Sequence, residues 1–165
     1  MGRKSTKENK NIYQISREKM NYTREVAAEK LKFISSDRIE KIENEKTLPH
    51  PEEILAMTDI YKNPLLCNYY CSHECPIGIE YVPEIKIKDL SQITLEMLAT
   101  LNKLSHEKER LIEITVDGKL TEEEIPDFLK IKEELEKMAL AIDSLNLWID
   151  NTIASGKIDK NLIPD

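Results

Sequence analysis

The chain has 165 residues, 33% of them charged and 40% hydrophobic, enough for one ordinary domain or two small ones. Ile, Leu, Glu and Lys dominate, with only four Gly, which predicts an all-α protein. No apolar run approaches membrane-spanning length and no apolar core follows the N-terminus, so we expect a cytoplasmic protein with no membrane partner.

The charge is unevenly distributed. Residues 1–50 contain 12 Lys or Arg and 8 Asp or Glu, a net charge of +4. The remainder has a net charge of −11, which gives −7 for the whole chain. A basic head on an acidic body fits a nucleic-acid-binding head, although acidic helices are also common simply because they are soluble.

The first ten residues are rich in Lys and lack an apolar pattern, so residues 1–10 are predicted to be a flexible arm. A first helix follows over residues 11–20, with Ile12 and Ile15 as its apolar residues. Residues 11–76 together are predicted to form one small domain.

Residues 23–46 read as two short helices joined by a tight bend. Thr23 is placed to cap the first helix, and small Ala27 and Ala28 allow close approach of a second. Ser35 or Ser36 caps that second helix, whose Ile39 and Ile42 give it one apolar face. Pro49 and Pro51 then mark a break before a further helix over residues 52–61.

This stretch resembles the helix-turn-helix of phage repressors and Cro, the XRE-like class, over roughly residues 10–66. The resemblance is carried by Thr23-Arg24-Glu25, Ala28-Glu29-Lys30-Leu31, Ser35 and, above all, the run from Arg38 to Lys46. Two departures stand out: Lys32-Phe33-Ile34 replaces the usual turn Gly, and Glu45 occupies another position where Gly is usual. The resemblance implies a five-helix DNA-binding domain.

It also implies which residues contact DNA. Arg24 and Lys46 would contact phosphate, together with backbone N–H groups at the helix starts. Base edges or phosphates would be met by Ser35, Ser36, Arg38 and Lys41, with Arg38 placed for guanine. Asp37 would accept from a cytosine amino group or position Arg38. The implied DNA-binding set is Thr23, Arg24, Ser35, Ser36, Asp37, Arg38, Lys41 and Lys46.

A helix is predicted from Pro64 to about His73, and the three cysteines lie along it and just beyond its end. Their odd count in a chain expected to be cytoplasmic argues against a disulfide framework. Cys67, Cys71 and Cys75 are four residues apart and share one helical face, and His73 could add a fourth ligand. The alternatives are packing of small apolar residues, a zinc or iron–sulfur site, and redox sensing.

Residues 77–89 are predicted to be a linker, with a short extended piece at 85–88. Two long helices over 90–156 then form an antiparallel hairpin, broken at Asp117-Gly118-Lys119 and reopened by a capping box from Thr121 to Glu124. Residues 157–165 are a tail. The predicted inner row of the first helix is Leu90, Ile93, Met97, Leu101, Leu104, Leu111 and Ile114 or Thr115. That of the second helix is Phe128, Ile131, Leu135, Met138, Ile142, Leu145 and Ile149.

The sequence therefore favours a dimeric DNA-binding transcriptional regulator, with double-stranded DNA as partner and the hairpin as the dimerisation element. Two rivals stay open: an interaction module on a helix-turn-helix scaffold whose hairpin binds a partner protein, and a metal or redox sensor using the cysteines. No Gly-rich phosphate loop, G-x-S-x-G or H-E-x-x-H occurs, so we expect no enzymatic activity.

Overall fold

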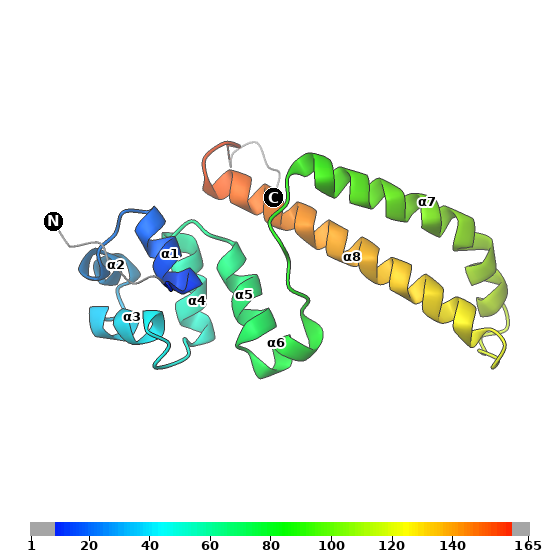
Figure 1. The fold of residues 1–165 in the computed structure, drawn as a ribbon, viewed down its shortest axis with the longest axis horizontal. Coiled ribbons are helices and arrows are strands. Elements are labelled where there is room, and N and C mark those ends of the chain that lie inside the picture. The colour runs from blue at the N-terminus through cyan, green and yellow to red at the C-terminus, as the bar shows by residue number, and fades with distance from the viewer. Residues whose placement is uncertain (1–8, 160–165) are drawn as a thin grey trace. The chain divides into compact units, whose positions relative to one another are not determined.

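The computed structural model describes residues 9–159, and within that range the secondary structure is entirely helical (Figure 1). The all-α prediction is confirmed. The helices are α1 (Ile12–Lys19), α2 (Arg24–Leu31), α3 (Ser36–Glu43), α4 (Pro51–Ile60), α5 (Leu65–His73), α6 (Pro76–Tyr81), α7 (Leu90–Thr115) and α8 (Ile125–Ala154). Among these described helices, none combines the length and apolar character needed to cross a bilayer. Most of the predicted arm, residues 1–8, and residues 160–165 of the predicted tail lie outside the described range.

The chain divides into two compact units, one comprising Met1–Glu84 with Asp150–Asp165 and the other Ile85–Ile149. One division, between Glu84 and Ile85, falls inside the predicted linker 77–89, and the other, between Ile149 and Asp150, falls inside the predicted hairpin 90–156. Residues 76–81 form α6, which was not predicted from the sequence. Helix α6 begins with Pro76 in its first turn and packs closely on α5. A Cβ on Gly78 would lie 2.1 Å from the carbonyl oxygen of Cys71, so only glycine permits this approach.

The core of the first unit is built from α1 to α5. Ile39 and Ile42 of α3 are both buried, as their spacing predicted, and they pack in one cluster with Ala27 of α2. Fully buried Ala27 has no side chain beyond Cβ, so α2 and α3 approach closely. The remaining members of the cluster are Tyr13, Leu31, Ile34, Ile54, Met57, Tyr61 and Leu66.

Side-chain caps fix where the first three helices begin. The side chains of Asn11, Thr23 and Ser35 accept hydrogen bonds from the backbone N–H groups of Gln14, Val26 and Arg38, respectively. Thr23 and Ser35 therefore cap the helices for which the sequence predicted them.

Two charged residues just after helix ends adopt backbone conformations with positive φ. Glu45 follows α3 with φ +58°, and the Lys46 N–H donates to the Lys41 carbonyl in a motif that usually places Gly at this position. Lys32 follows α2 with φ +64° and ψ −47°, and the Phe33 N–H donates to the Leu31 carbonyl across a strained γ-turn. Both positions adopt the left-handed backbone for which glycine is suited, and both are occupied by charged residues instead.

Helices α7 and α8 run antiparallel beside each other in the second unit (Figure 1). Ion pairs Lys103–Glu134 (3.4 Å), Lys130–Glu107 (2.6 Å) and Arg110–Asp127 (2.7 Å) join them. The predicted inner rows are partly wrong, because the exposed side chains include those of Leu90, Leu101, Leu135 and Ile142. The buried positions are Ile93, Thr100 and Ile114 on α7, and Ile131, Glu134, Ala141, Ser144 and Leu147 on α8. Each helix also carries apolar residues one position after its buried row, and these remain exposed.

Candidate nucleic-acid interface

The outer face of α3 is the feature predicted to meet DNA. Ser36, Asp37, Glu40 and Lys41 lie along the side of α3 opposite Ile39 and Ile42, and all four are at least partly exposed. The Ser35 hydroxyl accepts from the Arg38 N–H at 3.2 Å, which leaves its own hydrogen free to donate. Lys46, exposed just after α3, extends this face. The structure thus brings five of the predicted residues to one surface: Ser35, Ser36, Asp37, Lys41 and Lys46.

Arg38 is placed differently from the prediction that it reaches a guanine. Its Nε and Nη2 donate to the two carboxylate oxygens of Glu53 at 2.8 and 2.7 Å. Its Nη1 donates to the Thr47 hydroxyl at 2.7 Å, and Nη2 also donates to the Leu48 carbonyl at 2.9 Å. Every nitrogen of the guanidinium is engaged within the chain. Arg38 therefore clamps the start of α3 to the following loop and to α4.

The pKa of Glu53 reflects this clamp. Burial alone would raise the pKa of its carboxyl group, but hydrogen bonds from Arg38 and from the His50 N–H (2.7 Å), together with the charge of Arg38, lower it below the ordinary value. Glu53 is thus an ionised carboxylate in the first turn of α4, where the helix dipole also favours negative charge.

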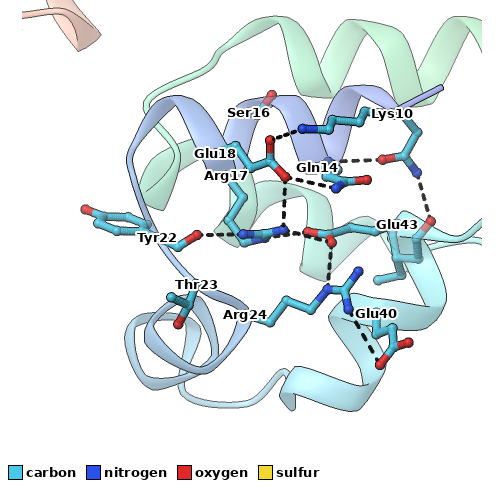
Figure 2. Close-up of polar contacts among 12 residues, drawn as sticks. Lys10, Gln14, Ser16, Arg17, Glu18, Tyr22, Thr23, Arg24, Glu40 and Glu43 are labelled. Carbon is cyan, nitrogen blue, oxygen red and sulfur yellow. Dashed lines mark hydrogen bonds and ion pairs between the residues drawn. The ribbon is translucent and has the colours of Figure 1, made fainter. Parts of the chain in front are cut away.

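A second clamp holds the other end of α3, around Glu43 (Figure 2). The Glu43 side chain is 1% exposed and accepts from Arg17 Nε at 2.5 Å, Arg17 Nη2 at 3.0 Å and Arg24 Nε at 2.8 Å. Arg17 Nη1 also donates to the Tyr22 carbonyl at 2.6 Å. Since Arg17 lies in α1 and Arg24 in α2, one buried carboxylate joins three helices. Arg24 also lies 3.6 Å from exposed Glu40.

The network extends along α1 (Figure 2). Glu18 accepts from Lys10 at 2.7 Å and from Gln14 at 2.9 Å. Burial opposes ionisation of Glu18, yet these hydrogen bonds and the nearby positive charges lower its pKa. The Asn11 amide donates to the Ile42 carbonyl at 2.9 Å, so the beginning of α1 is also fixed to the end of α3.

The charge presented outward by α3 is mixed. Lys41 pairs with Asp37 at 2.8 Å, and the hydrogen bond from Lys41 lowers the pKa of the Asp37 carboxyl. Glu40 and Glu45 add two further exposed carboxylates beside Lys46. The predicted basic contacts Arg24 and Arg38 are directed at carboxylates of the chain itself, and their contact with DNA stays a prediction.

The central role of Glu43 was not predicted from the sequence. One signal lay in the sequence, because Glu43 is four residues after buried Ile39 and so lies on the same helix face, where an acid needs a partner. The partner itself could not be found that way, since Arg17 lies 26 positions away on another helix.

The predicted metal ligands lie on α5 and at the start of α6. Cys67 is half-buried, with its sulfur 3.2 Å from the Thr58 hydroxyl. The His73 ring stacks on Tyr69 with centroids 4.5 Å apart, and its Nε2 lies 3.7 Å from a carboxylate oxygen of Glu84. His73 therefore has ring and carboxylate partners of its own.

The three thiols are free and half-buried. Burial raises the pKa of Cys71, and the neighbouring Cys75 and Cys67 raise it further, which disfavours a reactive thiolate. Within residues 9–159, no three His, Cys, Asp or Glu side chains are grouped so that they could hold a metal ion. The zinc or iron–sulfur site at Cys67, Cys71, His73 and Cys75 stays a prediction.

Comparison with known proteins finds no matching family model, curated protein or solved structure. A functional proposal for this chain therefore depends on the geometry of α2 and α3 and on the sequence resemblance that led to them.

Proposed function

We propose that the chain is a DNA-binding transcriptional regulator in which α2 and α3 form a helix-turn-helix and α3 docks in a major groove. In this proposal α1 to α5 form the five-helix DNA-binding domain. The α7–α8 hairpin joins two copies, so that two α3 helices read two half-sites.

The observation that carries the proposal is the way α3 is held. Two arginine–carboxylate clamps, Arg38–Glu53 at its start and Arg17–Glu43–Arg24 at its end, fix its inner side. Its outer side remains exposed along its whole length. An α-helix with its side chains is about 10–12 Å in diameter, and the major groove is about 12 Å wide. A short helix held rigidly at both ends loses little conformational entropy when it binds.

The contacts divide between direct and positioning roles. Ser35, Ser36, Lys41 and Lys46 would donate to phosphates or base edges, and Asp37 would accept from a cytosine amino group. Backbone N–H groups at the start of α2, next to Thr23, would face a phosphate. In this proposal Arg24 and Arg38 act by positioning α3.

The test is a fluorescence-anisotropy titration of a random-sequence duplex at several salt concentrations, with Lys41→Gln and Lys46→Gln variants. Each substitution should weaken binding and make the slope of log K against log salt shallower by about one, because one phosphate contact is lost. Lys62→Gln is the matched control, since Lys62 pairs with Asp59 on the surface (3.2 Å) much as Lys41 pairs with Asp37. Equal slopes for all three variants and the unsubstituted protein would contradict the proposal.

The second candidate is a protein-interaction module built on the same scaffold. It is favoured by the mixed charge of α3 and by Phe33 and Leu48, each 63% exposed beside the ends of α3. This module would bind random duplex DNA weakly or not at all. The titration therefore separates the two functions.

A further inference from the structure

Helices α7 and α8 expose large aliphatic side chains that the hairpin itself does not cover. Leu98, Leu101 and Ile112 on α7, and Leu135 and Ile142 on α8, are 43–53% exposed. These five residues are here called the apolar face. Their exposure is informative because all five fall into one stripe per helix.

The stripes bear a fixed relation to the buried rows. On α7, the three apolar-face residues each follow by one position a buried or half-buried residue: Met97, Thr100 and Leu111. On α8, the two apolar-face residues likewise follow the buried residues Glu134 and Ala141. One residue is a rotation of about 100° around a helix, so each stripe lies a quarter-turn from the buried row, in the same rotational sense.

Both stripes consequently lie on the same side of the pair. When two helices are antiparallel, equal rotations in the chain direction turn both stripes toward one side. The charged residues that join the helices confirm the orientation, because Lys103, Arg110 and Lys130 each precede an inner-row position by one residue and so lie on the opposite side. The interhelix ion pairs lie on one side of the hairpin and the apolar face lies on the other, where exposed Lys108 interrupts the α7 stripe between Leu101 and Ile112.

We propose that the apolar face is the surface on which a second copy of this chain docks, giving a four-helix arrangement around a two-fold axis. This inference rests on the part of the proposed function that assigns dimerisation to α7 and α8, and is independent of DNA binding. It identifies the residues of the interface and the side of the hairpin that forms it.

The side of the hairpin that carries the apolar face is large enough for a stable dimer. A 26-residue helix such as α7 is about 39 Å long and each helix is about 10 Å wide, so this side, with its polar positions included, covers roughly 800 Å². A standard interface buries about 800 Å² per partner. Two-fold symmetry matches an apolar face with another apolar face and requires no second complementary surface.

The charge of the unit argues against a membrane surface as the occupant. Residues 85–149 contain 9 Lys or Arg and 14 Asp or Glu, a net −5, which opposes binding to anionic lipid. Lys132 lies beside Leu135 and forms an ion pair with Glu136 of its own helix. The charge of its ammonium group is therefore neutralised at the edge of the apolar face, and its aliphatic stem extends that face.

The test is sedimentation velocity of the full chain over a range of concentrations. The unsubstituted protein should be a dimer at low micromolar concentration, and Leu101→Glu combined with Leu135→Glu should weaken dimerisation at least about 100-fold, because each copy buries two charges. Leu55→Glu, at a leucine 64% exposed on α4, is the matched control and should leave the dimer unchanged. A monomeric unsubstituted protein at about 100 μM, or a double variant that still dimerises, would overturn the proposal.

If the double variant unfolds, as judged by loss of its helical circular dichroism signal, a variant expected to gain affinity tests the proposal instead. Lys132→Leu should tighten the dimer by about tenfold, as one more aliphatic side chain enters each face. Unchanged affinity would overturn the proposal. DNA binding is measured separately from dimerisation. On a duplex too short for two copies, a folded but monomeric variant should show the same slope of log K against log salt per chain as the unsubstituted protein.

Discussion

Replacing Glu43 by Gln should destabilise the first unit severely, because it leaves the buried Arg17 guanidinium without its counter-charge. Arg17 is 6% exposed and donates to both oxygens of Glu43. Removing one partner of such a buried pair costs about 3–5 kcal/mol. For a unit of this size that corresponds to a melting temperature lower by about 12 °C or more. A total stability of about 5–15 kcal/mol would thus fall by a large fraction.

The chain offers both a matched control and separate reporters. Glu40→Gln changes the same residue type on the same helix, but Glu40 is half exposed and 3.6 Å from Arg24, so its loss should cost at most about 1 kcal/mol. All six Tyr lie between residues 13 and 81, whereas the single Trp, Trp148, lies in α8. Guanidinium denaturation followed by tyrosine near-UV circular dichroism therefore reports the first unit, and tryptophan fluorescence reports α8. If Glu43→Gln costs no more than Glu40→Gln, the reasoning is refuted.

Two further predictions concern the clamp on α4 and the contact of α5 with α6. The pKa of Glu53 is lowered in the folded state, so its stabilisation is present above its ordinary pKa of 4.5 and is lost as the pH falls below that value. Denaturation between pH 3 and 6 should accordingly show that the free energy of unfolding falls less with decreasing pH in Glu53→Gln than in the unsubstituted protein. The same pH dependence in both proteins would contradict the clamp. Gly78→Ala should cost at least about 2 kcal/mol in thermal unfolding, because the new Cβ meets the Cys71 backbone, which cannot move aside as a side chain can. Gly118→Ala, with nothing within 4 Å of its Cβ, should cost only the strain of a positive φ, about 1 kcal/mol, and equal losses for the two variants would be inconsistent with the close contact.

Local features of the fold could be predicted from sequence where a short range of residues decides them. Thr23 and Ser35 cap their helices as expected, and Ile39 and Ile42 are buried, because a cap and an apolar stripe each depend on neighbours within one or two turns. Helix α6 escaped prediction because it has only six residues and depends on the approach of Gly78 to α5.

The register of α7 and α8 could not be read from either helix alone. Each helix carries two apolar stripes one residue apart, and hydrophobic spacing fits both. The choice depends on pairs between the helices such as Lys130–Glu107 and Arg110–Asp127, which sequence periodicity does not reveal. The exposed stripes of the two helices form the apolar face, which we propose as the dimer interface.

The candidate interface was predictable as a surface but not in the roles of its arginines. Exposed Lys41 lies where a one-face helix pattern places it, and Lys46 is exposed just after the end of α3. Arg38 does not extend from this surface, because it donates hydrogen bonds to Glu53, which is 15 positions later on another helix. An arginine with a bidentate carboxylate partner inside the chain is held more strongly than an exposed one. Charge alone could not distinguish positioning arginines from those available to a ligand.

The central claim is that the outer face of α3 binds the phosphates and bases of duplex DNA. The most direct measurement is the affinity of the unsubstituted protein for a random-sequence duplex at several salt concentrations. The account predicts binding that weakens with salt, with a slope of log K against log salt of about −2 per chain from Lys41 and Lys46 alone. A slope near zero, or no binding at about 50 mM salt, would contradict it.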